Sequence, residues 1–276
     1  MTKNSVLTFA KKKNEGHKIT VLTAYDYTMA KLFNDSGIDS ILVGDSLGNV
    51  VLGYDDTVSV TMDDMVCHCR AVARACDKAM VVVDMPFMSY QVSVEEAMRN
   101  AGRLMQEGRA NAVKLEGGVR VCPQIKAMSE AGIPVMAHLG LTPQSINAFG
   151  GYKVAGRTIE KAEKLIAEAL AVQEAGAFAL VLELVPEKLA RLITSKLHIP
   201  TIGIGSGSGC DGQVLVGQDM LGMTQGLSPK FVKVFEPVGE MIKTAVGKYI
   251  NEVEKGEYPA VEHGFSIDDE IIEKLY

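Results

Sequence analysis

The chain is short of several features that would place it in a special class. It has no tryptophan, and none of its apolar stretches approaches the ~18 uninterrupted residues of a membrane-spanning helix. Its first residues carry lysines but no apolar core, so we expect no secretory signal. Basic residues are outnumbered, 28 against 34 acidic ones, which gives a net charge of −6. Because nucleic-acid binding needs a basic surface, we expect no nucleic-acid partner, and we expect no membrane partner either.

Cysteine is scarce and irregularly spaced, which argues against a disulfide framework. The odd count of five is typical of reduced thiols, and we expect a cytoplasmic protein. Cys67-His68-Cys69 has metal-ligand residue types, but within a helix Cys67 and Cys69 point to different faces. We therefore do not expect zinc there. The other cysteines are Cys76, Cys122 and Cys210.

The remaining composition is that of an ordinary globular protein, with 47% hydrophobic and 22% charged residues. Barrel folds routinely run to about 250 residues as one domain, and this chain has 276. No linker or low-complexity tract divides it. We therefore expect a single domain over residues 1–276, with helical extensions at its N-terminal and C-terminal ends.

Short apolar runs rich in β-branched residues recur along the chain and predict strands. Each run is nearly continuous in apolar residues and is bounded by Gly, Pro or Asp, as strands covered on both faces are. The predicted strands are Ile19–Ala24, Ser40–Gly44, Ala79–Asp84, Ala112–Glu116, Ile133–His138, Phe178–Glu183, Pro200–Gly205 and Gln213–Val216.

Helical patterns alternate with these strands. Asp26, Thr61 and Ser93 stand where helix N-caps are expected. A strand followed by a helix, repeated about eight times, favours an α/β fold closed into a (β/α)8 TIM barrel, with an open doubly wound sheet as the alternative. The predicted helices are Asp26–Asn34, Thr61–Asp77, Ser93–Glu107, Cys122–Ala131, Thr158–Ala175, Pro186–Leu197, Pro229–Lys255 and a packed terminal helix over Ile267–Tyr276.

Ionisable residues stand at or just beyond the C-terminal ends of five successive predicted strands. In a barrel these ends share one mouth, where catalytic groups gather. Because an unpaired buried charge is costly, the groups need a shared partner, and a cation is the simplest one. Lys114 lies two positions before Glu116, so both side chains point to one face of their strand. The residues at the strand ends are Asp45, Asp84, Glu116, His138 and Glu183.

Three carboxylates predict a hard metal ion at this mouth. Mg²⁺ takes one or two carboxylates directly and keeps several waters, whereas zinc prefers nitrogen and sulfur ligands. Asp45, Asp84 and Glu116 would supply the oxygen ligands. Lys114 would place a positive charge beside the ion, where it can bind a carboxylate or phosphate of a substrate.

A glycine-rich run follows the seventh predicted strand. Residues 207–212 match G-x-G-x-x-G by letter, but no long helix opens there, so we do not expect a dinucleotide site. A phosphate cradle and a flexible loop are both open interpretations of this run.

Five short motifs occur in order between about Thr23 and Phe235. They are GDSLG at 44–48, DMPF at 84–87, VKLEGG at 113–118, HLGLTPQS at 138–145 and CDGQVLV at 210–216. Together they resemble the ketopantoate hydroxymethyltransferase family. The resemblance implies a (β/α)8 barrel of the phosphoenolpyruvate/pyruvate-type superfamily.

The resemblance also implies an enzyme and its chemistry. A hydroxymethyl group passes from 5,10-methylenetetrahydrofolate, a co-substrate, to the keto acid 3-methyl-2-oxobutanoate through a Mg²⁺-stabilised enolate, giving 2-dehydropantoate for pantothenate and coenzyme A biosynthesis. By the same resemblance the protein is a cytoplasmic homo-oligomer, commonly a decamer.

Site roles follow from the resemblance as well. Asp45, Asp84 and Glu116 would form the Mg²⁺ site, while Asp45, Ser46, Asp84 and Lys114 would surround the keto acid. Glu183 would accept the proton from C3 of the substrate, and His138 would line the mouth and contact substrate.

Other classes of function stay open at this point. One is another Mg²⁺-dependent keto-acid C–C lyase or mutase of the same superfamily, although the chain has no Lys-Lys-Cys-Gly-His-like loop. The other is a barrel that only binds keto acids or folate, which would have no need of a base such as Glu183. A purely structural subunit would leave the charged strand ends unexplained.

Overall fold

Eight parallel strands close into one barrel in the computed structural model, which describes residues 3–149, 151, 154–224 and 229–275. Each strand pairs with the next in sequence, and β8 pairs with β1. The TIM-barrel prediction is thereby confirmed, and the open-sheet alternative is wrong. The strands are β1 Ile19–Thr23, β2 Ser40–Val43, β3 Met80–Asp84, β4 Ala112–Glu116, β5 Val135–Gly140, β6 Ala179–Glu183, β7 Thr201–Ile204 and β8 Gly212–Leu215.

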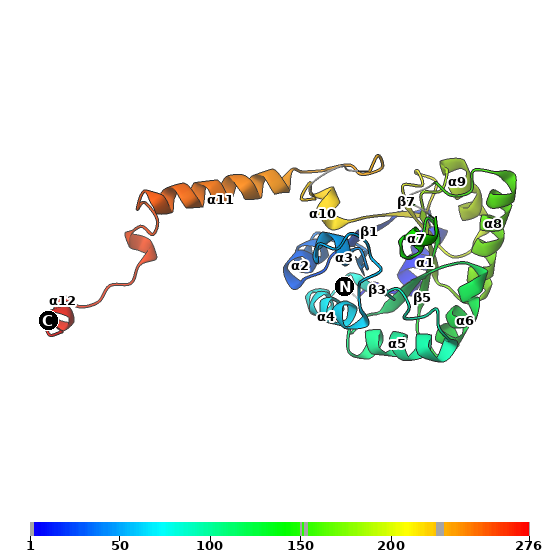
Figure 1. Cartoon of the computed structure of the whole chain (residues 1–276), viewed down its shortest axis with the longest axis horizontal. Coiled ribbons are helices and arrows are strands. Elements are labelled where there is room, and N and C mark those ends of the chain that lie inside the picture. The colour runs from blue at the N-terminus through cyan, green and yellow to red at the C-terminus, as the bar shows by residue number, and fades with distance from the viewer. Residues whose placement is uncertain (1–2, 150, 152–153, 225–228, 276) are drawn as a thin grey trace. The chain divides into compact units, whose positions relative to one another are not determined.

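Helices follow the first six strands and lie around the outside of the barrel (Figure 1). The predicted caps are confirmed: Asp26 accepts from the N–H of Met29, Thr61 forms a capping box with Asp64, and Ser93 accepts from a backbone N–H one turn on. These helices are α2 Tyr27–Asp35, α4 Met62–Ala75, α5 Val94–Gln106, α6 Cys122–Glu130, α8 Ile159–Glu174 and α9 Glu187–Lys196, and short helices α3 Leu47–Val50 and α7 Ile146–Phe149 lie in the connecting loops.

The connection between β7 and β8 has no helix, unlike the strand–helix repeat that the sequence predicts. This glycine-rich segment instead packs closely on its neighbours. A Cβ on Gly207 would lie 2.4 Å from Glu187, and one on Gly209 would lie 2.8 Å from Arg191, both on α9. A Cβ on Gly212 would lie 2.5 Å from the carbonyl oxygen of Ile19. Close backbone approach therefore explains the glycines of the G-x-G-x-x-G match.

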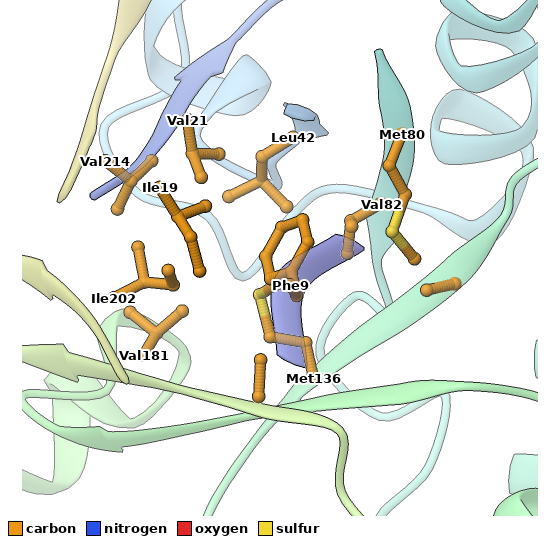
Figure 2. Close-up of a cluster of buried hydrophobic side chains, with 12 residues drawn as sticks. Phe9, Ile19, Val21, Leu42, Met80, Val82, Met136, Val181, Ile202 and Val214 are labelled. Atoms are coloured by element: carbon orange, nitrogen blue, oxygen red, sulfur yellow. The ribbon is translucent and has the colours of Figure 1, made fainter. Parts of the chain in front are cut away.

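The N-terminal helix α1, Val6–Asn14, packs against the inner apolar layer of the barrel. Phe9 is fully buried, and Figure 2 shows it at the centre of side chains that come from β1, β2, β3, β5, β6, β7 and β8. Lys12 and Lys13 fasten the helix further through ion pairs to Asp39 and Asp211. The inner layer consists of Ile19, Val21, Leu42, Met80, Val82, Ala112, Met136, Ala179, Val181, Ile202 and Val214.

Truncation of Phe9 to alanine should lower the free energy of unfolding by ~3–5 kcal/mol, because a buried aromatic ring leaves a cavity that its neighbours only partly fill. Urea unfolding followed by circular dichroism measures this loss. Leu7→Ala is the matched control, since Leu7 lies on the same helix with 76% of its surface exposed, and it should stay within ~0.5 kcal/mol. Equal losses in the two variants would contradict the burial of Phe9 against the barrel interior.

The chain divides into two compact units, the first holding the barrel and the second the C-terminal helices. In the second unit, α11 spans Val238–Glu254 rather than the predicted Pro229–Lys255, because Pro237 disfavours helix for the residue before it. The predicted terminal helix exists as α12, Asp269–Glu273, and no residue of it is buried. Across the residues described, no helix has the length and apolar character needed to span a membrane. Short helices α10, Gly217–Met220, and η3, Val261–His263, complete this region.

Candidate active site

The inward-facing positions of the strands change from apolar at one end to ionisable at the other. On β3, Met80 and Val82 belong to the inner apolar layer, and Asp84 follows two positions later. Because side chains alternate along a strand, Asp84 points to the same side. Three further strands change from apolar to ionisable side chains in the same way. The changes are from Ala112 to Lys114 and Glu116 on β4, from Met136 to His138 on β5, and from Val181 to Glu183 on β6.

All seven residues singled out from the sequence line one cavity of about 120 Å³. The prediction that they share one mouth is confirmed. Apolar side chains form another part of the wall, which gives the cavity both a charged and a hydrophobic surface. The seven residues are Asp45, Ser46, Asp84, Lys114, Glu116, His138 and Glu183, and the apolar ones include Leu42, Val181, Ile204 and Val214.

Lys114 is the cationic side chain of this cluster. Its Nζ lies 2.9 Å from Asp84 Oδ1, and the two residues are direct neighbours on β4 and β3. Burial opposes its charge, but Asp84, Glu116 and Asp45 outweigh burial and raise the pKa of Lys114 above its ordinary value. The positive form of Lys114 is therefore favoured inside the cavity.

The charged form of Asp45 is disfavoured in this cavity. Burial, together with the nearby carboxylates of Asp84 and Glu116, raises the pKa of Asp45 to about 8. The backbone N–H of Asp45 donates to Asp84 Oδ2 over 3.0 Å, so the two residues are tied together. A further cation would relieve this repulsion.

His138 lies between two carboxylates. Its Nδ1 is 3.5 Å from Glu116 Oε1, and its Nε2 is 3.2 Å from Glu183 Oε2. Burial and the charge of Lys114 oppose protonation, but Glu116 and Glu183 together raise the pKa of His138 to about 9. His138 thus links the carboxylate on β4 to the one on β6.

Glu183 is placed by an unusual stretch of backbone. Its carbonyl oxygen accepts the N–H of Leu141 over 2.9 Å. Gly140 has φ +101°, and a Cβ there would lie only 2.1 Å from that oxygen, so only glycine fits. The next residue, Leu184, has φ +48°, a strained value for a side chain of this size.

The side chain of Glu183 is also more accessible than its charged neighbours. It is 14% exposed, against 3–5% for the side chains of Glu116, Asp84, His138 and Lys114.

The donor set fits a hard divalent cation. Every candidate ligand atom is a carboxylate oxygen, and Asp84 Oδ1 is paired with the ammonium of Lys114 over 2.9 Å. Within the described residues, no three His, Cys, Asp or Glu side chains lie close enough together to form a preformed metal site. The oxygen chemistry of the three carboxylates is nevertheless of the kind that Mg²⁺ takes, because this ion binds one or two carboxylates and keeps its waters.

Sequence reasoning assigned no role to three polar residues near the cavity. Tyr25 lies with its hydroxyl 2.8 Å from Ser46 Oγ. Gln144 contacts both Asp45 and Glu116, and Tyr90 contacts Gln144. Only the presence of Gln144 within the motif at 138–145 could have drawn attention to it.

The Cys67-His68-Cys69 triplet lies on α4. Cys67 is exposed and Cys69 is buried, so the two thiols face different sides of the helix, as predicted. His68 Nδ1 is 2.6 Å from the carbonyl oxygen of Tyr25. The histidine therefore has a structural partner.

Solved structures with a similar fold include enzymes of several activities. A phosphonopyruvate hydrolase, solved with oxalate and Mg²⁺, has a TM-score of 0.61 and 15% identity, covering 99% of this chain and 94% of its own. A 2,3-dimethylmalate lyase, a PEP mutase/isocitrate lyase superfamily member, has a TM-score of 0.57 and 15% identity over 95% of this chain and 92% of its own. At this identity they show the fold alone.

Sequence comparison is far more specific than this. The 3-methyl-2-oxobutanoate hydroxymethyltransferase of Clostridium novyi (strain NT) is 63% identical over 99% of this chain and 100% of its own length. The enzyme of the same name from Enterococcus faecalis (strain ATCC 700802 / V583) is 58% identical with the same coverage. These relatives favour the transferase over the lyase or mutase alternative and over a barrel that only binds. A model of ketopantoate hydroxymethyltransferase matches residues 3–261, and the chain therefore belongs to that family.

Proposed function

We propose that this enzyme transfers a hydroxymethyl group from 5,10-methylenetetrahydrofolate to 3-methyl-2-oxobutanoate, giving 2-dehydropantoate, with Mg²⁺ as cofactor. Overall, the folate supplies the carbon and water supplies the hydroxyl oxygen. The observation that carries this proposal is the position of Glu183. It is the most exposed carboxylate of a buried charged cavity, in a chain whose relatives bear the name of this transferase.

Glu183 is the proposed general base. The C3–H bond of the keto acid is weakly acidic, and a positioned base contributes about 10²–10⁴-fold to its removal. His138 Nε2 lies 3.2 Å from Glu183 Oε2, and protonated His138 would form an ion pair with this carboxylate. His138 would also contact substrate, because it lines the same cavity.

Asp45, Asp84 and Glu116 would hold Mg²⁺, which when bound supplies positive charge that stabilises the enolate oxygen by several kcal/mol. Support comes from the structurally similar phosphonopyruvate hydrolase, which was solved with oxalate and Mg²⁺. Lys114 would meet the carboxylate of the keto acid, while Ser46 and the two aspartates would surround its polar end. All four residues line the cavity.

The apolar wall of the cavity suits the alkyl end of the substrate. Val181, Ile204 and Val214 lie in this wall, together with Leu42. A small branched keto acid would bury its methyl groups there, where each buried methylene-sized group contributes about 0.8 kcal/mol. The charged wall would then hold the keto and carboxylate oxygens.

The proposal includes a homo-oligomer, a decamer by family resemblance, in the cytoplasm. Helix α11 supports the oligomer, because it exposes large apolar side chains of the kind that protein interfaces bury. The five cysteines support a reducing compartment, since each is a free thiol. The exposed side chains on α11 are Met241, Ile242, Val246, Tyr249, Ile250 and Val253.

A reconstituted assay tests the reaction. We expect the purified chain to form 2-dehydropantoate only when the keto acid, 5,10-methylenetetrahydrofolate and Mg²⁺ are all present, as product analysis by mass spectrometry will show. Cleavage or rearrangement of the keto acid without folate would favour a lyase or mutase. Keto-acid binding without any product would favour a barrel that only binds.

A further inference from the structure

Gln144 connects two of the carboxylates that face the cavity. Its backbone N–H donates to Glu116 Oε2 over 3.1 Å, and its side-chain Nε2 donates to Asp45 Oδ2 over 2.9 Å. Asp45 follows β2, Glu116 ends β4, and Gln144 lies in the loop after β5. One residue therefore ties carboxylates from two different strands to a third.

Tyr90 determines which way the amide of Gln144 faces. The hydroxyl of Tyr90 accepts the backbone N–H of Glu116 over 3.2 Å, so its own proton is free to be donated. It donates to Gln144 Oε1 over 2.7 Å. The opposite orientation of the amide would turn its NH₂ group away from Asp45 and place Oε1 against two acceptors.

All polar atoms of the Gln144 side chain have partners in this orientation. Nε2 also donates to the carbonyl oxygen of Met85 over 2.9 Å, and Oε1 also accepts from Gln91 Nε2 over 3.3 Å. Gln144 is 4% exposed and Tyr90 is 1% exposed, so water does not compete for these bonds. A fully satisfied buried network of this kind has one stable arrangement.

We propose that Tyr90 and Gln144 are positioning residues that hold Asp45 and Glu116 in the geometry that a divalent cation requires. Gln144 holds one oxygen of each carboxylate, which leaves Oδ1 of Asp45 for the cation or its waters, while Oε1 of Glu116 lies 3.5 Å from His138 Nδ1. Without these bonds, two like charges in a buried cavity would move apart. This inference rests on the proposed Mg²⁺ site and adds residues that do not touch the cation.

Binding of Mn²⁺ in the absence of substrates, measured by electron paramagnetic resonance, tests the inference. Gln144→Met keeps the size of the side chain and the backbone N–H to Glu116 but loses the bond to Asp45, and it should weaken Mn²⁺ binding about 10–100-fold. Tyr90→Phe should also weaken Mn²⁺ binding. In the double variant the combined loss should be smaller than the product of the single losses, because Tyr90 acts largely through Gln144.

Gln106→Met is the matched control, since Gln106 is an exposed glutamine at the end of α5. It should bind Mn²⁺ within about twofold of the wild-type chain. Thermal unfolding without metal accompanies each variant, and a purely structural role would lower the melting temperature while leaving Mn²⁺ affinity unchanged. Should Tyr90→Phe fail to fold, Gln144→Met still decides the question.

The outcomes separate this inference from the proposed function. If the wild-type chain binds Mn²⁺ and Asp84→Asn does not, yet Gln144→Met binds as the wild type does, the positioning role is wrong and the metal site stands. If the wild-type chain fails to bind Mn²⁺, or Asp84→Asn binds it equally well, the metal site itself is wrong, and the positioning role with it.

Discussion

Replacing Glu183 with glutamine should reduce hydroxymethyl transfer by about 10²–10⁴-fold, the contribution of a positioned general base. The amide has nearly the shape of the carboxylate but cannot accept the C3 proton. Asp45, Asp84 and Glu116 are untouched by the change, so the divalent cation and the keto acid should bind almost as they do to the wild-type chain. The loss should therefore appear in kcat rather than in KM.

Exchange of the C3 proton with deuterated solvent isolates this step from the folate chemistry. Nuclear magnetic resonance of the keto acid, with Mg²⁺ and without folate, should show exchange in the wild-type enzyme and a loss of similar size in Glu183→Gln. Glu174→Gln, at an exposed position on α8, is the control and should exchange normally. Undiminished exchange in Glu183→Gln would remove Glu183 from the role of base.

The two ends of the barrel interior perform different tasks. Phe9 and the apolar inner layer provide packing at one end, while the ionisable side chains at the strand ends provide chemistry at the other. Burial of like charges is unfavourable, as the raised pKa of Asp45 shows. The barrel can sustain this cost because its strands fix the charged side chains at neighbouring positions, such as Asp84 beside Lys114 and Glu116 beside His138.

Much of this arrangement could be predicted from the sequence, because it follows from the period of a strand. Each of the eight predicted strands occurs in the structure. Every predicted strand end lies within two residues of the observed one. Once the strands were recognised, Lys114 and Glu116 had to share a face, and Asp84, His138 and Glu183 had to lie at the same end of the barrel. The shared cavity was therefore predictable without coordinates.

Contacts between loops could not be predicted in this way. Gln144 and Tyr90 lie in the loops after β5 and β3, where no period relates a residue to its neighbours. An uncharged glutamine in a loop is usually exposed, and its burial against Asp45 depends on the path of three separate loops. The start of α11 differs from the prediction for another reason, since Pro237 interrupts a sequence whose pattern is otherwise helical on both sides.

Replacing Asp84 with asparagine should lower Mg²⁺-dependent turnover by about 10³-fold. Asp84 Oδ1 pairs with the ammonium of Lys114, and Asp84 Oδ2 accepts the N–H of Asp45, so its carboxylate lies between the other charged groups of the cavity. Its neutral replacement removes one of three negative charges that attract the cation. If the cation supplies ~4 kcal/mol to the proton-transfer step, its loss corresponds to about three powers of ten in rate.

Turnover measured against Mg²⁺ concentration, with Mn²⁺ binding to the same preparations, tests this expectation. Asp63→Asn is the control, because Asp63 lies on the surface with 84% of its side chain exposed and should behave as the wild-type chain does. Asp84→Asn should fail to saturate at Mg²⁺ concentrations that saturate the wild type, since Asp45 and Glu116 alone attract the cation less strongly. Activity of the wild-type enzyme that survives exhaustive chelation would contradict the role given to all three carboxylates, because the enolate would then form without the cation that they are proposed to bind.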